Sequence, residues 1–136
     1  MWNRAPGAAM TSASRVDCLA IAHRFAAEPY DWPVAPRFRP GRRWSVRLVD
    51  RPDYEVWLTT WLPGQGTSFH AHDGAGAVHV MRGELVELVQ PDDHSEPAAI
   101  HLLRSGFGRL LTPGRHRIVN QQPFVAVSVH VLAVVT

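Results

Sequence analysis

Short runs of alternating apolar and polar residues fill the chain from residue 44 onwards, and Pro, Gly or Asp separates most of them. Alternation with a period of two is typical of β-strands that bury one face. About nine such runs, closely spaced and with no helical run between them, predict an all-β sandwich or barrel rather than parallel βαβ units. Gly83 is expected to mark a tight hairpin or bulge between two of them. The predicted strands cover residues 45–50, 54–62, 67–72, 77–82, 84–90, 98–104, 108–111, 116–120 and 125–135.

The first part of the chain has a different pattern. Apolar residues at helical spacing predict one amphipathic helix from Ser12 to Glu28, with Ser14 as its N-cap and Pro29 at its end. The next segment, PYDWPVAPRFRPGRRW, is rich in proline, which disfavours both helix and central strand. We therefore expect an extended arm that runs over the surface and is held down by three aromatic residues, Trp32, Phe38 and Trp44.

The length of the chain indicates the number of domains. A chain of 136 residues has the size of one domain. We predict that residues 1–43 form the helix and arm, packed on a barrel, and that residues 44–136 form the barrel itself.

The net charge is +2 and the sequence contains no lysine, so chemistry that needs a lysine amine, such as a Schiff base, is excluded. Nucleic-acid binding is not expected, because we interpret the one arginine cluster as a solvated linker. The cluster contains Arg37, Arg39, Arg42 and Arg43.

Cys18 is the single cysteine, which excludes an intrachain disulfide and a thiolate cluster for zinc or iron–sulfur. This cysteine usage predicts a cytoplasmic protein. The first residues lack an apolar signal-peptide core, and no stretch approaches the ~20 apolar residues of a membrane-spanning helix. No membrane interaction is therefore expected.

Three histidines are candidate metal ligands. His70 and His72 are two residues apart in the run TSFHAH, so strand alternation would place both imidazoles on one face. His116 follows Pro113 and Gly114, which are expected to form a turn that leads into a new strand. Three neutral imidazoles leave coordination positions open, which suits a catalytic metal better than a closed structural site.

The spacing of these residues resembles the two motifs of the cupin superfamily. Gly64, His70, His72, Gly76 and Gly83 are spaced as in the first motif. The second motif is matched, with one residue fewer than usual between glycine and histidine, by Pro113, Gly114, His116 and Asn120. The resemblance implies a single cupin (jelly-roll-type) β-barrel with a short N-terminal helix.

One departure makes the resemblance more specific. Gly76 stands where the usual cupin motif has a glutamate ligand, and the resulting three-histidine set is similar to that of the cysteine dioxygenase family. The segments WLPGQGTSFHAHDGAGAVHVMRGELVE and GRHRIVN resemble that family as well. The resemblance implies an iron(II) enzyme that uses O2 to oxidise a small thiol to its sulfinate, acting as a monomer or homodimer. Imidazole sites also accept other divalent metals.

The resemblance also assigns residues around the metal. The last strand places Ser128, His130 and Leu132 on one face, where the family commonly has serine, histidine and tyrosine in a hydrogen-bonded relay. Ser128 and His130 are therefore candidate catalytic residues, while Leu132 cannot donate a proton. Gly76 also stands where eukaryotic enzymes have the cysteine that cross-links to this tyrosine, so no such cross-link is expected.

Substrate recognition departs from the family pattern too. The family binds the substrate carboxylate with an arginine two residues after the aromatic residue of the first strand. Counting from Trp44, that position is Val46, and its neighbour Arg47 would face the other side unless a bulge turned it inward. Trp44 and Arg47 are the candidate substrate-binding residues, and a thiol other than cysteine is expected.

The remaining polar and aromatic residues have structural interpretations. Glu84 and Glu87 are expected to face solvent, Arg117 to point away from the pocket, and Asn120 to make hydrogen bonds at a strand end. Six further residues are assigned to core or ordinary surface positions: His23, His79, His94, His101, Trp57 and Trp61. Two rival functions stay open: a cupin of other chemistry, such as a non-thiol dioxygenase or isomerase, and a non-catalytic cupin that binds a small molecule.

Overall fold

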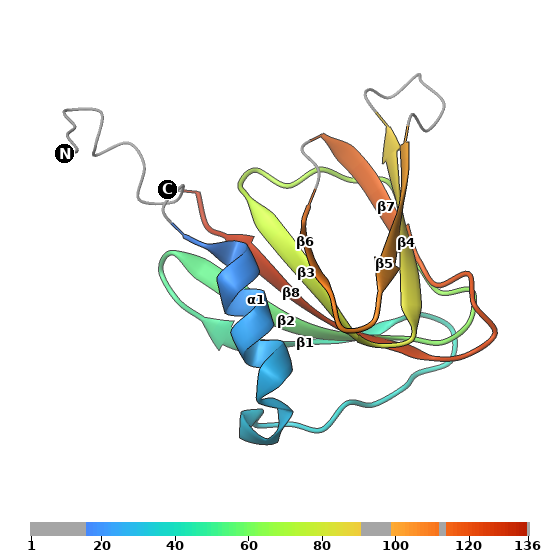
Figure 1. The fold of residues 1–136 in the computed structure, drawn as a ribbon, viewed down its shortest axis with the longest axis horizontal. Helices are drawn as coiled ribbons and strands as arrows, with labels where there is room; N and C mark the ends of the chain where they lie inside the picture. The colour runs from blue at the N-terminus through green and yellow to red at the C-terminus, as the bar shows by residue number, and fades with distance from the viewer. Residues whose placement is uncertain (1–15, 91–98, 112–113, 136) are drawn as a thin grey trace.

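The computed structural model describes residues 16–90, 99–111 and 114–135, and Figure 1 shows the fold. The chain runs through α1 (Cys18–Ala27), a 3-10 turn η3 (Pro29–Asp31), β1 (Trp44–Asp50), β2 (Tyr54–Trp61), β3 (Gly76–Arg82), β4 (Glu84–Gln90), β5 (Ala99–Arg104), β6 (Gly108–Leu110), β7 (Arg115–Val119) and β8 (Ala126–Ala133). The predicted all-β fold with a short N-terminal helix is confirmed. Ser12, Ser14, His94 and Pro113 lie outside the described residues.

The strands form two antiparallel sheets that face each other (Figure 1). The larger sheet has the order β1-β2-β8-β3-β6 and the smaller has the order β5-β4-β7. A shared apolar cluster fills the space between them and includes Trp61, Val78, Val80, Leu85, Leu103, Ile118 and Ala126. The inner faces of both sheets therefore surround one interior.

The helix covers the outer face of the larger sheet. Cys18 and Ala22 of α1 are buried against Val129 and Val131 of β8, whose side chains alternate with the inward-facing Ser128 and His130. Asp17 caps the helix, because its carboxylate accepts a hydrogen bond from the Ala20 N–H at 3.0 Å. An aspartate at this position supplies an acceptor for an otherwise unpaired N–H of the first turn. The N-cap is thus Asp17 rather than Ser14, and the helix ends before Pro29 as predicted.

The proline-rich segment crosses back over the same sheet towards β1. The Trp32 indole N–H donates to the Phe25 carbonyl at 3.1 Å, and the Thr60 hydroxyl donates to the Arg37 carbonyl. These contacts tie the segment to α1 and to β2. The division of the chain at residue 43 into two parts stays a prediction.

Two details of the predicted strands are wrong. The run at residues 67–72 is not a regular strand: His70 pairs with His116 of β7 in an isolated bridge, and a second isolated bridge joins the preceding Gly66 to Val119. Gly83 joins strands of different sheets, so it marks a corner rather than a hairpin. Its φ is +76°, and a side chain there would collide with the Val125 carbonyl oxygen, which is why glycine is needed.

No helix in the part of the chain described here is long and apolar enough to cross a membrane.

Candidate metal centre

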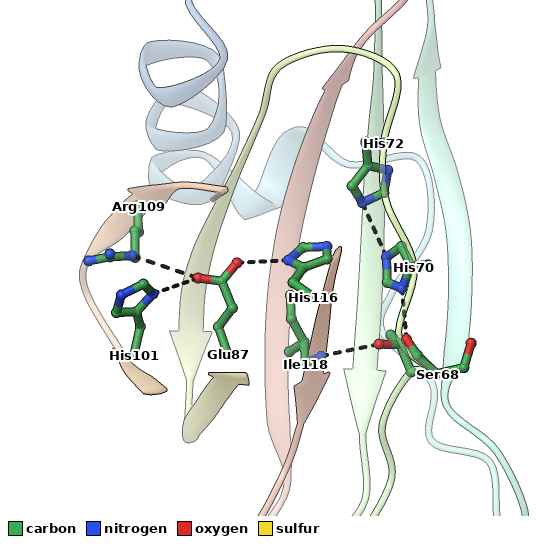
Figure 2. Close-up of polar contacts among 9 residues, drawn as sticks. Ser68, His70, His72, Glu87, His101, Arg109, His116 and Ile118 are labelled. Carbon is green, nitrogen blue, oxygen red and sulfur yellow. Dashed lines mark hydrogen bonds and ion pairs between the residues drawn. The ribbon is translucent and has the colours of Figure 1, made fainter. Parts of the chain in front are cut away.

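His70, His72 and His116 converge on one point between the sheets (Figure 2). His116 comes from β7, and the other two come from the loop that precedes β3. The backbones of His70 and His116 pair through two hydrogen bonds of 2.9 and 2.8 Å, which aligns the loop with the strand. One ligand atom from each ring lies within 4.8 Å of the other two, and the Nε2 atoms of His70 and His72 are 3.2 Å apart. The backbone pairing therefore brings together the three predicted ligands.

Hydrogen bonds at the Nδ1 atoms of His70 and His116 define the tautomers of these two rings. His70 Nδ1 lies 2.8 Å from the Ser68 carbonyl oxygen, and His116 Nδ1 lies 2.7 Å from the Glu87 carboxylate. Both partners are acceptors, so each Nδ1 carries the proton and each Nε2 has a free lone pair. His116 Nε2 is buried without a hydrogen-bond partner. A divalent cation satisfies such converging lone pairs, so the donor set fits a metal.

The electrostatics favour the neutral, metal-binding form of His70 and His72. Burial lowers the pKa of His70. Partial burial and the neighbouring His70 and His116 lower the pKa of His72 to about 4, although His72 is the most exposed of the three. Neutral imidazole is the form that binds metal ions, so the lowered pKa values of His70 and His72 reduce proton competition at these two ligands.

The three histidines line a cavity of about 280 Å³. This volume lies just below the range of roughly 300–1,000 Å³ that is typical of ligand pockets, and it fits a small substrate. The other residues of its wall are Arg43, Ser45, Trp57, Thr59, Trp61, Thr67, Leu111, Ile118, His130 and Leu132. A larger hollow of about 630 Å³ lies under the proline-rich arm, but it is lined mainly by apolar side chains and is remote from the histidines.

The two candidate catalytic residues have different positions. His130 lines the cavity, whereas Ser128 is fully buried behind it. The Trp61 indole N–H donates to Ser128 Oγ at 2.9 Å, and Ser128 Oγ lies 2.8 Å from His130 Nε2. Ser128 Oγ therefore accepts from Trp61 and shares a second hydrogen bond with His130 Nε2. Burial, followed by the charge of Arg43 and the three metal-site histidines, lowers the pKa of His130 to about 3.

The pairing of β1 with β2 decides which side chains of β1 reach the cavity. Ser45 lies opposite Thr59 and its hydroxyl is 2.7 Å from the Thr59 hydroxyl, and both residues line the cavity. The inference that Val46 faces the cavity is therefore wrong, because strand parity turns it to the other face. Trp44 lies on that other face as well and is absent from the cavity wall.

Arg47 shares the face of Ser45 but stops short of the cavity. Its guanidinium makes ion pairs of 3.3 Å with Asp50 and Glu55 and lies over the Trp57 ring. The β1 bulge falls after Arg47, between Arg47 and Val49. The role of Arg47 in substrate binding stays a prediction.

Arg43 is the arginine that reaches the cavity, so its interpretation as part of a solvated linker is wrong. It is half-buried and donates to the Gly66 carbonyl at 3.4 Å, and burial lowers its pKa. The sequence contained a signal for this: Arg43 precedes Ser45 by two residues and so shares its face in an extended chain.

Several residues assigned to structural or surface roles also belong to this region. Trp57 and Trp61 both line the cavity. Glu87 is fully buried rather than solvent-facing, and it is bound to His116 and to His101. The strand pattern alone did not reveal its position, because Leu85 and Val89 on its face and Val86 and Leu88 on the other face are all apolar. Asn120 makes strand-end hydrogen bonds to Trp61 and Phe124 as predicted.

Comparisons with known proteins agree with this architecture. The family described as cysteine dioxygenase type I matches residues 9–133. A comparison with curated sequences gives no significant match. The fold is similar to that of the TT1209 protein of Thermus thermophilus, with a TM-score of 0.60 and 24% identity over 72% of this chain and 89% of that one. It is also similar to a cupin superfamily protein of Desulfitobacterium hafniense, with a TM-score of 0.59 and 14% identity over 75% of this chain and 84% of that one.

A cupin domain from Bordetella pertussis is similar too, with a TM-score of 0.57 and 22% identity over 74% of this chain and the whole of that one. At these identities the structural neighbours show the fold, which is the cupin barrel expected from the sequence. The family match covers nearly the whole chain. The chain belongs to the cysteine dioxygenase type I family.

Proposed function

We propose that this protein is an iron(II)-dependent dioxygenase that converts a small thiol to its sulfinate. The observation that carries the proposal is the convergence of His70, His72 and His116 on one point in a small cavity, with the lone pairs of at least two Nε2 atoms directed there. The family match supports the reaction type. Family membership alone does not specify the thiol.

The reaction balances without a further reductant. The thiol sulfur loses four electrons, O2 gains four, both oxygen atoms become bonded to sulfur and the thiol proton is released. Iron(II), when bound by the three histidines, would supply the redox chemistry that makes O2 reactive. Because the three ligands are neutral, the loaded site carries positive charge, which favours binding of the substrate as a thiolate.

The chain's own residues would orient the substrate. Arg43 is the cationic side chain of the cavity wall and would bind an anionic group of the substrate. Trp57, Leu111 and Leu132 provide apolar surface for its carbon chain. His130, held by Ser128, is a neutral hydrogen-bonding group beside the substrate. These contacts favour a small thiol that carries a carboxylate or another anion.

The test is metal analysis of protein prepared without chelators, combined with oxygen uptake over a panel of small thiols and non-thiols. Stoichiometric iron and oxygen uptake with sulfinate formation are expected. Uptake only with non-thiol substrates would instead support a cupin of other chemistry. Tight binding of a small molecule with no oxygen uptake would support a non-catalytic cupin.

A further inference from the structure

The inner face of β4 carries a buried carboxylate directly behind the candidate metal site. Glu87 has 0% exposed side chain and lies between Leu85 and Val89 on the face that points into the barrel. Burying a carboxylate is unfavourable unless hydrogen bonds and opposite charges compensate it. An apolar residue would fill this core position at lower cost, so the contacts of Glu87 indicate its role.

Those contacts come from both sheets and include a candidate metal ligand (Figure 2). Glu87 Oε2 lies 2.7 Å from His116 Nδ1, and Oε1 lies 2.9 Å from His101 Nδ1. The Arg109 Nε atom, on β6 of the other sheet, is 3.9 Å from Oε1. His101 and Arg109 share one oxygen, while the other oxygen contacts His116. The carboxylate is therefore held in one orientation from behind.

Among the three converging histidines, His116 differs in what lies behind its ring. His70 Nδ1 donates to a neutral backbone carbonyl of Ser68, whereas His116 Nδ1 donates to a carboxylate. A hydrogen bond to a carboxylate draws the Nδ1 proton away from the ring and makes Nε2 a better electron donor to a metal. It also supplies negative charge near a ligand set that consists of neutral rings.

We propose that Glu87 is a positioning residue of the metal site, which fixes His116 as the Nδ1–H tautomer and strengthens its Nε2 as a ligand. The inference rests on the proposed three-histidine metal site. Glu87 would take over part of the role of the carboxylate ligand for which Gly76 leaves no side chain, acting through His116 instead of binding the metal. His101 and Arg109 fix the carboxylate and have no contact with the metal in this scheme.

The first test is a Co²⁺ titration of the full metal-free chain, followed by absorption spectroscopy, for the unaltered protein and for Glu87→Gln. Glutamine keeps the size and an acceptor oxygen but removes the charge. Outer hydrogen-bond partners of metal-bound histidines typically contribute 10–100-fold to metal affinity, and a loss of about that size is expected together with a changed Co²⁺ spectrum. The matched control is Glu84→Gln on the same strand, whose carboxylate binds Gln122 and Arg104 and has no contact with the histidines. This control should bind Co²⁺ within twofold of the unaltered protein.

Two results separate the failure of this inference from the failure of the proposed function. Co²⁺ binding that is lost in His116→Ala but unchanged in Glu87→Gln would overturn the role of Glu87 and leave the metal site intact. Absence of Co²⁺ binding by the unaltered chain would overturn both.

A second measurement needs no variant, in case Glu87→Gln does not fold. In the Zn²⁺-loaded, ¹⁵N-labelled protein, long-range ¹H–¹⁵N spectra report which nitrogen of each histidine is protonated. His116 should show a protonated Nδ1 with a strongly downfield proton and a metal-bound Nε2. A metal-bound Nδ1, or a Nδ1 proton at an ordinary position, would contradict the inference.

Discussion

The guanidinium of Arg43 lies 5.8 Å from the centre of the Trp61 ring, in the wall of the cavity that holds the three histidines. The contact holds the guanidinium of Arg43, which directly precedes β1, against Trp61 at the buried end of β2. Trp61 in turn donates its indole N–H to Ser128, which holds His130. One aromatic residue therefore positions both the cationic and the neutral polar groups of the cavity.

Replacing Arg43 should change which thiols are bound. Arg43→Gln is expected to raise KM for anionic thiols by about 10–100-fold, because a charge-assisted hydrogen bond contributes roughly 1.5–3 kcal/mol. A neutral thiol of similar size should be affected within about threefold. The measurement is KM across a series of thiols with and without a carboxylate. Arg47→Gln is the matched control, because Arg47 is 43% exposed and already pairs with Asp50 and Glu55.

Removing one ligand should remove the metal without unfolding the barrel. His70→Ala, His72→Ala and His116→Ala are each expected to lose most of the bound iron, because two imidazoles bind a divalent metal far more weakly than three. The β-sheet signal in circular dichroism should stay, since none of the three histidines belongs to the apolar clusters that form the core. His23→Ala, on the exposed side of α1, is the control for iron content. Full iron retention in His116→Ala would exclude the three-histidine site.

The partly buried His130 predicts how stability depends on pH. A histidine in an unfolded chain has a pKa near 6.5, whereas that of His130 is lowered to about 3. Between these values the unfolded chain binds one more proton, so the free energy of unfolding decreases as pH falls below about 6.5, by up to ~1.4 kcal/mol per pH unit.

This dependence can be isolated by comparing His130→Gln with the unaltered protein in urea titrations from pH 7.5 to 4, with metal removed by a chelator. The variant should lose less stability on acidification. His70, His72 and His79 have lowered pKa values too, but they are common to both proteins. Parallel curves for the two proteins would contradict the assignment.

Leu132 predicts inefficient oxidation of L-cysteine. It lines the cavity two residues after His130, at the position where the family commonly has tyrosine. Leu132→Tyr is expected to raise the turnover number, because a positioned proton donor typically increases a reaction rate 10²–10⁴-fold. A newly introduced hydroxyl that is not optimally placed should still supply a measurable part of this increase. The matched control is Leu111→Tyr, which introduces a tyrosine elsewhere in the same cavity wall and should not raise the turnover number. Efficient cysteine oxidation by the unaltered protein that is insensitive to His130→Ala would refute the relay argument.

Local pattern was sufficient for most of the strands and for the three candidate ligands. The alternation of apolar and polar residues predicted β3, β4 and β8 to within one or two residues, because each strand buries at least one face and its period is visible in sequence. The spacing of His70, His72 and His116 predicted a shared site even though the first two lie in a loop. Two residues on one extended backbone segment point the same way whether or not that segment is paired.

What the sequence could not decide was which face of a strand points inward when both faces are apolar or both carry polar residues. In β1, the face that points to the cavity is set by the pairing of Ser45 with Thr59, two residues that are distant in sequence. As a result, Arg43 and Ser45 line the cavity wall and Val46 does not. In β4, Glu87 is acceptable in the interior only because His116 and His101 meet it there. The chain by itself determined the fold class and the three candidate ligands, since these follow from local periodicity and spacing. The cavity-lining arginine and the buried carboxylate were decided by tertiary structure, because the free energy of a buried charge depends on partners that only folding brings together.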